Sequence, residues 1–225
     1  GTSATNTLDV QSVIALTGAT NPLVITNGTF KLSSASTLTP FTSGAGATIP
    51  ATGGMTVNGG TISTGNVTWN NNGTFTVSAG TLNIGTASGN AFNNNSGSSF
   101  TISGGAMNIA GRFFNSGGSA THTGGTMTVG TIGASLASNG MYEASSTANL
   151  SISGSASVVF QNPNSGAGGD LKIISGSGTK TISGGTFQFG NASTPASSVF
   201  IVNSSASLNN VIINSTNAPK VTLAA

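Results

Sequence analysis

The chain contains no cysteine and very few charged side chains. Without cysteine, disulfide bonds contribute nothing to stability, so the fold has to be held together by packing and backbone hydrogen bonds. Five Lys or Arg, three Asp or Glu and one His give a formal net charge of +2 over 225 residues. Nucleic-acid binding requires a stripe of basic side chains that neutralises phosphates, so we expect no nucleic-acid partner.

Long apolar runs are also missing. No stretch of about 18 apolar residues occurs, so the sequence predicts no membrane-spanning helix in this segment. The first residues, GTSATNTLDV, lack the basic start and apolar core of a signal peptide. Charge-poor compositions rich in Gly, Ser, Thr and Asn are common in bacterial surface proteins. If this chain is one of them, its export signal lies outside this segment or has been removed.

What the sequence has instead is an internal repeat. The stretch VTWNNNGTFTVSAGTLNIG (67–85) matches ATIPATGGMTVNGGTISTG (47–65) position for position at an offset of 20 residues. The turn after the central strand of each repeat falls at Gly60, Gly80, Gly105, Gly125, Ser155 and Gly185, in steps of 20, 25, 20, 30 and 30 residues. Self-similarity at this period is typical of solenoids, in which insertions are confined to the turns.

Apolar and polar residues alternate within each repeat, which is the period of a strand with one buried side. Each repeat is predicted to contain two successive strands whose inward side chains form a core. In one repeat these side chains are Phe75 and Val77 in the first strand and Leu82 and Ile84 in the second. A third strand is marked by a series that we expect to stack inside as a ladder, with the amides that follow several of its members forming turn ladders: Ile49, Trp69, Phe92, Phe114, Tyr142 and Phe160.

The sequence thus predicts an all-β fold, a parallel and right-handed β-helix with three short strands per coil of about 20–30 residues. Residues 1–22 fit the repeat poorly and are expected to form an entry strand or N-terminal cap, while residues 23–225 form the β-helix. No polar capping helix follows the last strands. Because an uncapped solenoid end exposes unpaired backbone groups, we expect the segment to continue in a longer chain or against another subunit.

Few residues qualify as a catalytic or metal site. Enzymes built on β-helices need clustered carboxylates, and the acids here are Asp9, Glu143 and Asp170. Glu143 and Asp170 lie 27 residues apart, about one enlarged coil, so either they stack as a pair or they are two solvated loop residues, which we favour. His122 and Lys180 fall at inward positions and are interpreted as a hydrogen-bonded core or core-edge histidine and a snorkelling or locally shifted lysine. We expect no enzymatic activity, no cofactor and no metal.

The outward face of the central strand carries ranks of hydroxyl groups. The candidate binding face consists of Thr56, Thr76, Ser78, Thr101, Ser103, Thr121, Thr123, Thr181 and Ser183. Uncharged Thr arrays of this kind resemble those of ice-binding β-solenoids, but Thr is also simply a good outward β residue. Ser at many second-rank positions and the uneven loops argue against ice binding.

The phrases AGTLNIG, GGAMNIAG, GGTMTVG and GGTFQFG resemble the β-strand repeats of autotransporter passenger domains. Together with NNGTFTVSAGTLNIG and TNGTFKLSSASTLTPF, they are also similar to the large surface proteins that Bacteroidota export by type IX secretion. The resemblance implies a secreted, extracellular adhesin, stalk or filament of the bacterial cell surface and transfers no site residue. Its partners are expected to be cell-surface or extracellular glycans, other surfaces or copies of itself. Ice binding and a degenerate polysaccharide-active β-helix remain the alternatives.

Overall fold

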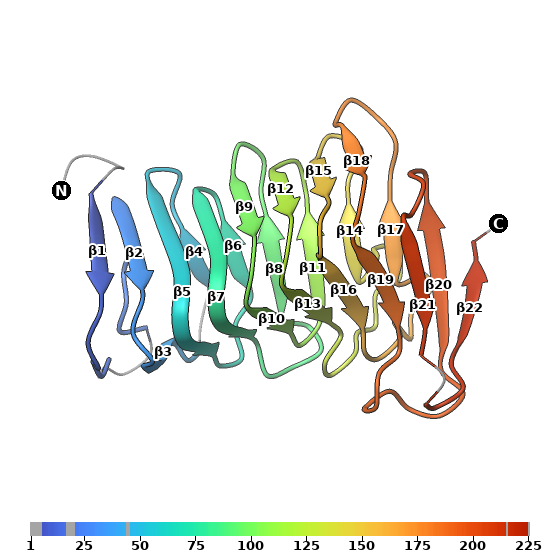
Figure 1. The fold of residues 1–225 in the computed structure, drawn as a ribbon, viewed down its shortest axis with the longest axis horizontal. Helices are drawn as coiled ribbons and strands as arrows, with labels where there is room; N and C mark the ends of the chain where they lie inside the picture. The colour runs from blue at the N-terminus through green and yellow to red at the C-terminus, as the bar shows by residue number, and fades with distance from the viewer. Residues whose placement is uncertain (1–5, 17–20, 44–45, 215, 225) are drawn as a thin grey trace.

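The computed structural model describes residues 6–16, 21–43, 46–214 and 216–224. This part of the chain forms β-strands and no helix, and no membrane-spanning helix is therefore found in it. The strands follow one another along the long axis of the molecule, from β1 (Thr7–Val10) at one end to β22 (Lys220–Leu223) at the other (Figure 1). An all-β, solenoid-like fold is therefore confirmed.

Parallel pairing arranges the strands in three ladders. The first ladder contains β1, β2 (Gly28–Leu32), the first half of β5 (Gly53–Thr64), the first half of β7 (Thr74–Ile84), β9 (Ser99–Ile102), β12 (Ser119–His122), β15 (Asn149–Ile152) and β18 (Lys180–Ile182). The second contains β3 (Thr37–Phe41), the second halves of β5 and β7, β10 (Ala106–Ile109), β13 (Thr126–Val129), β16 (Ser157–Phe160), β19 (Thr186–Phe189) and β21 (Asn210–Ile213). Because β5 and β7 run through both ladders, the two form one 14-stranded sheet.

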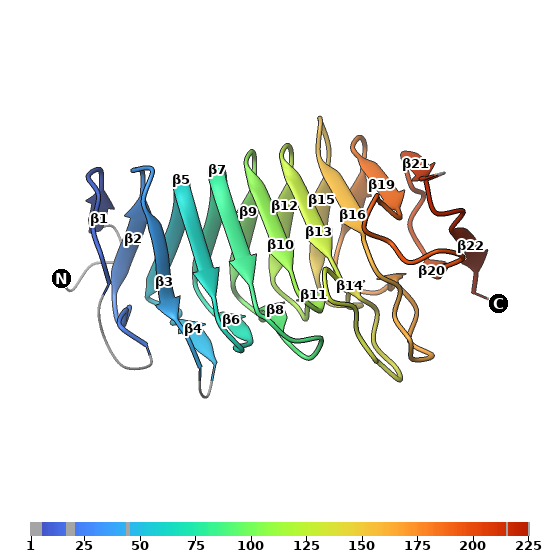
Figure 2. The ribbon, with the colours of Figure 1, turned by 90° about the horizontal axis from the view of Figure 1, so that it is seen from below.

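The third ladder is a separate eight-stranded sheet, which we call sheet B. It contains β4 (Ala47–Ile49), β6 (Trp69–Asn71), β8 (Ala91–Asn94), β11 (Arg112–Asn115), β14 (Tyr142–Ala144), β17 (Leu171–Ile173), β20 (Val199–Ser204) and β22. The view from below shows the chain passing from the long strands β5 and β7 toward β6 and β8 before it returns (Figure 2).

The registers reproduce the repeat that the sequence predicts. The successive Cα partners in the first ladder are Met55, Phe75, Phe100, Ala120, Leu150 and Lys180. Their spacings equal the predicted steps, so the insertions do lie in the turns. The inward residues of the first two ladders are buried as expected between the terminal strands, apart from Lys180 and Ile182 in the partly exposed β18. At the ends of the ladders, Leu8 of β1 and Val211 and Ile213 of β21 keep the inward register but are exposed.

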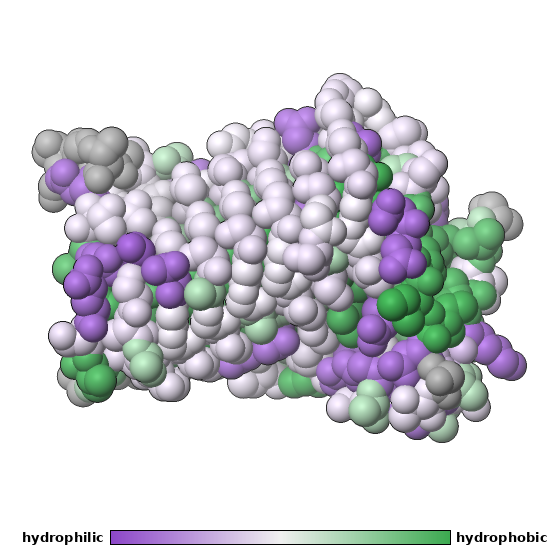
Figure 3. All heavy atoms as spheres, in the orientation of Figure 1, coloured by the Kyte–Doolittle hydropathy of each residue, from purple (hydrophilic) through white to green (hydrophobic). Residues whose placement is uncertain are grey.

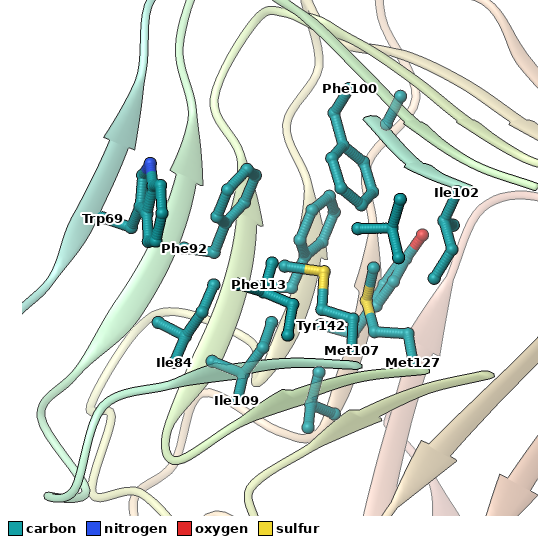
Figure 4. Close-up of a cluster of buried hydrophobic side chains, with 14 of the residues drawn as sticks. Trp69, Ile84, Phe92, Phe100, Ile102, Met107, Ile109, Phe113, Met127 and Tyr142 are labelled. Atoms are coloured by element: carbon teal, nitrogen blue, oxygen red, sulfur yellow. The ribbon is translucent and has the colours of Figure 1, made fainter. Parts of the chain in front are cut away.

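The core is lined by aromatic rings in mutual contact. Figure 4 shows Trp69, Phe92, Phe113 and Tyr142 in a row beside aliphatic side chains of the second ladder. Ring centroids lie 6.0 Å apart for Phe92 and Phe113, and 5.0 Å apart for Phe113 and Tyr142, both in stacked orientation. Trp69 and Tyr142 are 0% and 1% exposed, so their assignment to the core is confirmed.

Two members of the predicted third-strand series, Phe114 and Phe160, were wrong, and a third, Ile49, is buried in sheet B as predicted but differs in register. Phe114 is partly exposed and points outward, because its neighbour Phe113 is the residue paired with Phe92. Phe160 belongs to β16 in the second ladder, and Leu171 follows Tyr142 in sheet B. Ile49 lies opposite Asn71, since β4 and β6 pair at an offset of 22 residues rather than 20.

A ladder of buried amides runs beside the rings. Asn71, Asn94 and Asn115 are each 0% exposed and occupy the second inward position of β6, β8 and β11. Asn71 Nδ2 donates to Asn94 Oδ1 (2.8 Å), and Asn94 Nδ2 donates to Asn115 Oδ1 (3.1 Å) and to the carbonyl of Ser119 (3.2 Å). An amide ladder that satisfies backbone groups of neighbouring repeats therefore exists, but it lies inside the strands and not in turns. The amides directly after Trp69 and Phe92, Asn70 and Asn93, which were expected to form it, occupy the outward column, and the buried members are Asn71, Asn94 and Asn115.

The turn between the first and second ladders is a column of glycines. Gly60, Gly80, Gly105 and Gly125 all have positive φ, and each stacks on the backbone of the preceding turn. A Cβ added to Gly105 (φ +68°) would lie 2.6 Å from the carbonyl oxygen of Gly80. The glycine-rich phrases are therefore structural turns, in which a side chain would collide with the repeat before it.

We predict that Gly105→Ala lowers the free energy of unfolding by roughly 2–4 kcal/mol, because it combines a strained φ with a backbone collision. Gly89→Ala is the matched control, since a Cβ there meets nothing within 4 Å, and its effect should stay within about 0.5 kcal/mol. Urea unfolding followed by circular dichroism measures both. Equal effects of the two substitutions would contradict the stacked-turn account.

Candidate binding surface

The first outward rank of the candidate face is a single cross-strand column. Thr56, Thr76, Thr101 and Thr121 are successive Cα partners, and Ser151 and Thr181 continue the column. Inward neighbours such as Phe75 and Val77 fix its orientation, because successive residues of a strand point to opposite sides. At the N-terminal end the same column begins with Lys31 and Asp9, which form an ion pair of 3.0 Å.

The second rank is less regular than the first. Ser103, Thr123 and Ser183 directly follow the last residues of β9, β12 and β18, although their backbone N–H groups still donate to the preceding repeat. Ser78 lies where the register between β5 and β7 shifts, and its Oγ donates to Asn58 Oδ1 at 2.7 Å. The structure therefore brings the nine candidate residues to one face in two ranks, the second of them along the turns.

The middle of this face is pale in Figure 3, the colour of Thr, Ser and Gly, and strongly hydrophilic residues gather toward its edges. An open depression of about 340 Å³ lies over the later strands of the column and is lined by Ser119, Ala120, Thr121, Asn149, Leu150, Ser151, Thr179 and Thr181. This end of the hydroxyl surface is thus hollowed. Such a surface offers hydrogen bonds and methyl contacts without charge.

The interpretation of Glu143 and Asp170 as solvated loop residues was wrong, since they are 4% and 0% exposed. Asp170 accepts hydrogen bonds from the backbone N–H groups of Asn164 and Ile201, both at 2.7 Å. Glu143 accepts one from Gly140 at 2.9 Å. The two carboxylates share no partner in the described part of the chain, and each fixes a loop locally.

Cations surround Glu143, a grouping that the sequence analysis missed. Lys172 Nζ lies 3.8 Å from Glu143 Oε1, and Arg112 Nη1 lies 4.0 Å from Glu143 Oε2. The Arg112 guanidinium is also 4.4 Å from the centroid of the outward Phe114 ring. The outward orientation of Phe114 could have been recognised from the pattern aromatic-x-Asn, which begins at Trp69, Phe92 and Phe113. In this pattern the residue between the ring and the Asn points outward.

His122 is a hydrogen-bonded core residue, as predicted. It is 2% exposed, and its Nε2 lies 3.3 Å from the carbonyl oxygen of Gly125. Burial lowers its pKa to about 4 because the charged imidazolium loses its hydration. Within the described ranges, no three His, Cys, Asp or Glu side chains come together in a way that could hold a metal ion.

Lys180 keeps the register of Leu150, so its side chain starts at an inward position. Its Nζ reaches the turn and donates to the carbonyl oxygens of Ala148 (2.6 Å), Gly178 (3.0 Å) and Ser146 (3.4 Å). Partial burial lowers its pKa. The snorkelling interpretation is confirmed, and the ammonium group serves to bind turn carbonyls.

Two buried groups should give opposing pH dependences of stability. Because the pKa of His122 falls from 6.5 to about 4 on folding, the unfolded state binds more protons between these values, and stability rises with pH there. Burial raises the pKa of Asp170 from 3.8 to about 6, so stability falls as pH rises across that window. Each contribution is at most about 3 kcal/mol, and the two nearly cancel.

We predict that Asp170→Asn makes the free energy of unfolding rise more steeply between pH 4 and 6.5 than in the unsubstituted chain. His122→Val, which copies Val77 of the same column, should make it fall over the same range. Urea unfolding at several pH values measures the slopes. Parallel curves for the three proteins would show that neither group titrates as its burial requires.

No family model, curated protein or solved structure matches this chain. Two surface features are left from which function can be inferred. One is the hydroxyl face of the 14-stranded sheet, and the other is the cluster of Arg112, Glu143 and Lys172 beside the outward Phe114 ring on sheet B.

Proposed function

We propose that the chain is a structural and adhesive segment of a bacterial extracellular protein, an adhesin, stalk or surface filament without enzymatic activity. In this proposal the fold is a right-handed parallel β-helix with three strands per coil, one in each ladder. The observation that carries the proposal is the continuity of the three ladders, in which interior strands are hydrogen-bonded on both sides.

Several properties suit such a role. Parallel ladders along the whole length stiffen the molecule and leave few segments for local opening, which favours resistance to proteolysis. The outward Thr and Ser ranks, including Thr76 and Thr101, supply many weak hydrogen-bonding and methyl contacts. An uncharged surface of this kind suits contacts with glycans, with other surfaces or with copies of the same chain.

Ice binding is a second candidate, favoured by the in-register column of Thr56, Thr76, Thr101 and Thr121. Ser151 interrupts the column, and the depression over Thr121 and Thr181 departs from the flat surface that lattice matching needs. A polysaccharide-active β-helix is the remaining alternative. The separate hydrogen-bond partners of Glu143 and Asp170 give it no support.

Display of the chain on a non-adherent bacterium should increase the number of cells retained under flow on surfaces coated with mixed neutral and acidic glycans. Cells displaying Gly80→Val/Gly105→Val, in which the stacked turns are disrupted, are the folding control. Equal retention of cells that display the folded chain, the disrupted chain or no chain would overturn the adhesive role.

Thermal hysteresis of the purified chain separates the second candidate. If ice binding operates, the hysteresis is lost when Thr76, Thr101 and Thr121 are changed to Tyr. It is kept when Thr61, Thr81 and Thr126, outward positions of the second ladder, are changed in the same way. The adhesive proposal predicts no hysteresis in any of these proteins.

A further inference from the structure

Sheet B contains a region that departs from the repeats in its charge. The chain has eight Lys, Arg, Asp and Glu residues in total, and four of them, Arg112, Glu143, Asp170 and Lys172, lie on or next to the consecutive strands β11, β14 and β17. Insertions in repeat proteins often form loops on one face, and that face often carries the binding residues. Here the long turns 130–141 and 161–170 flank these strands. This region is therefore the first place to seek a specific ligand.

An outward aromatic ring lies in the same region. Phe114 occupies a cross-strand column of sheet B whose members are Thr48, Asn70, Asn93, Phe114, Glu143, Lys172 and Asn203. Every other aromatic residue of the chain is buried. A partly exposed ring on a strand, with amides on one side, offers an apolar plane to the C–H face of a ligand.

The guanidinium of Arg112 is held against this ring without using its donors. It lies 4.4 Å from the Phe114 ring centroid, and its Nη1 is 4.0 Å from Glu143 Oε2. Nη1 is itself buried and has no hydrogen-bond partner, and none of the hydrogen bonds within the described residues starts from this guanidinium, whose side chain is 18% exposed. A planar group with five N–H donors that is oriented but not saturated is suited to bidentate recognition of a carboxylate.

Glu143 acts as a support for the cations. Its buried carboxylate is fixed by the Gly140 N–H and lies between Arg112 and Lys172. Lys172 Nζ also donates to the Ser138 carbonyl at 2.6 Å. Arg112 and Lys172 together carry one positive charge more than Glu143 neutralises, so their immediate surroundings favour an anionic ligand. Asp170, which accepts from the N–H groups of Asn164 and Ile201, brings the four charged residues of the region to a net charge of zero when it is ionised.

Hydrogen-bonding amides extend the region along the sheet. Asn93 Nδ2 donates to Asn70 Oδ1 at 2.9 Å, directly beside Phe114 in the column. From Asn70 to Lys172 there are four interstrand steps of about 4.8 Å, which makes a strip roughly 19 Å long. That length and its sequence of amides, ring and cations match an oligosaccharide better than a small ion.

We propose that this strip, Asn70, Asn93, Phe114, Arg112 and Lys172, binds a carbohydrate that carries a carboxylate. The ring packs on a sugar face, the amides meet hydroxyl groups, and Arg112 pairs with the carboxylate of a uronic or sialic acid. The inference rests on the proposed adhesive function and names one partner class for it. It does not depend on the Thr column of the other sheet.

Isothermal titration calorimetry of the whole chain with trigalacturonate and with 3′-sialyllactose tests the site and separates the two sources of carboxylate. Galactotriose and lactose are the neutral controls. We expect binding of at least one acidic sugar, a tenfold or larger loss of affinity in Arg112→Gln and in Phe114→Thr, and a smaller loss in Arg112→Lys. Lys31→Gln removes one positive charge, as Arg112→Gln does, but on the other sheet, and its affinity for the acidic sugar should stay within twofold of that of the unsubstituted chain.

Circular dichroism and melting curves establish whether each variant is folded. If Arg112→Gln does not fold, the affinities of Arg112→Lys and Phe114→Thr still test the site. The inference is overturned if neither acidic sugar binds, if the neutral sugars bind equally well, or if Lys31→Gln weakens binding as much as Arg112→Gln. Retention of displayed cells on neutral glycans together with any of these results would leave the adhesive function standing and remove only this site.

Discussion

The structure depends on parallel stacking of equivalent residues along three backbone ladders. Each inward side chain has to fit the side chains directly before and after it, which is why rings contact rings and Asn94 bonds to both Asn71 and Asn115. The same constraint selects glycine at Gly80 and Gly105, where the backbone of the preceding turn occupies the space of a side chain. A chain without cysteine can be held in this way because every repeat reinforces its neighbours.

Repetition also determines where the surface is regular and where it is distinctive. On the outer face of the first ladder it produces the column of Thr76, Thr101 and Thr121, a surface with many similar weak contacts. On sheet B the column changes from amides to Phe114 and Glu143, and the neighbouring position becomes Arg112. A general adhesive surface and a specific binding strip therefore arise from one scaffold, and the second requires only a few departures from the repeat.

Much of this architecture could be predicted from the sequence because the alternation of apolar and polar residues and the 20-residue period are strong signals. The registers of the first two ladders and the Thr column follow from them directly. Phe114 and Phe160 were predicted wrongly because the 20-residue period does not hold in sheet B, where β4 and β6 pair at an offset of 22 and long turns precede β14 and β17. Burial of Glu143 and Asp170 was missed for a related reason: the loops that cover them are insertions without a repeat to compare.

The central claim is that equivalent positions stack at one interstrand spacing along the molecule. Because the chain lacks cysteine, nitroxide labels can be placed on pairs of introduced cysteines and their separation measured by pulsed electron paramagnetic resonance. Thr56 and Thr121 are three ladder steps apart, and Thr56 and Thr181 are five. We predict separations of roughly 14 and 24 Å, each broadened by the label tethers. Equal separations for the two pairs, or distributions as wide as those of the urea-unfolded chain, would contradict the stacked-ladder account.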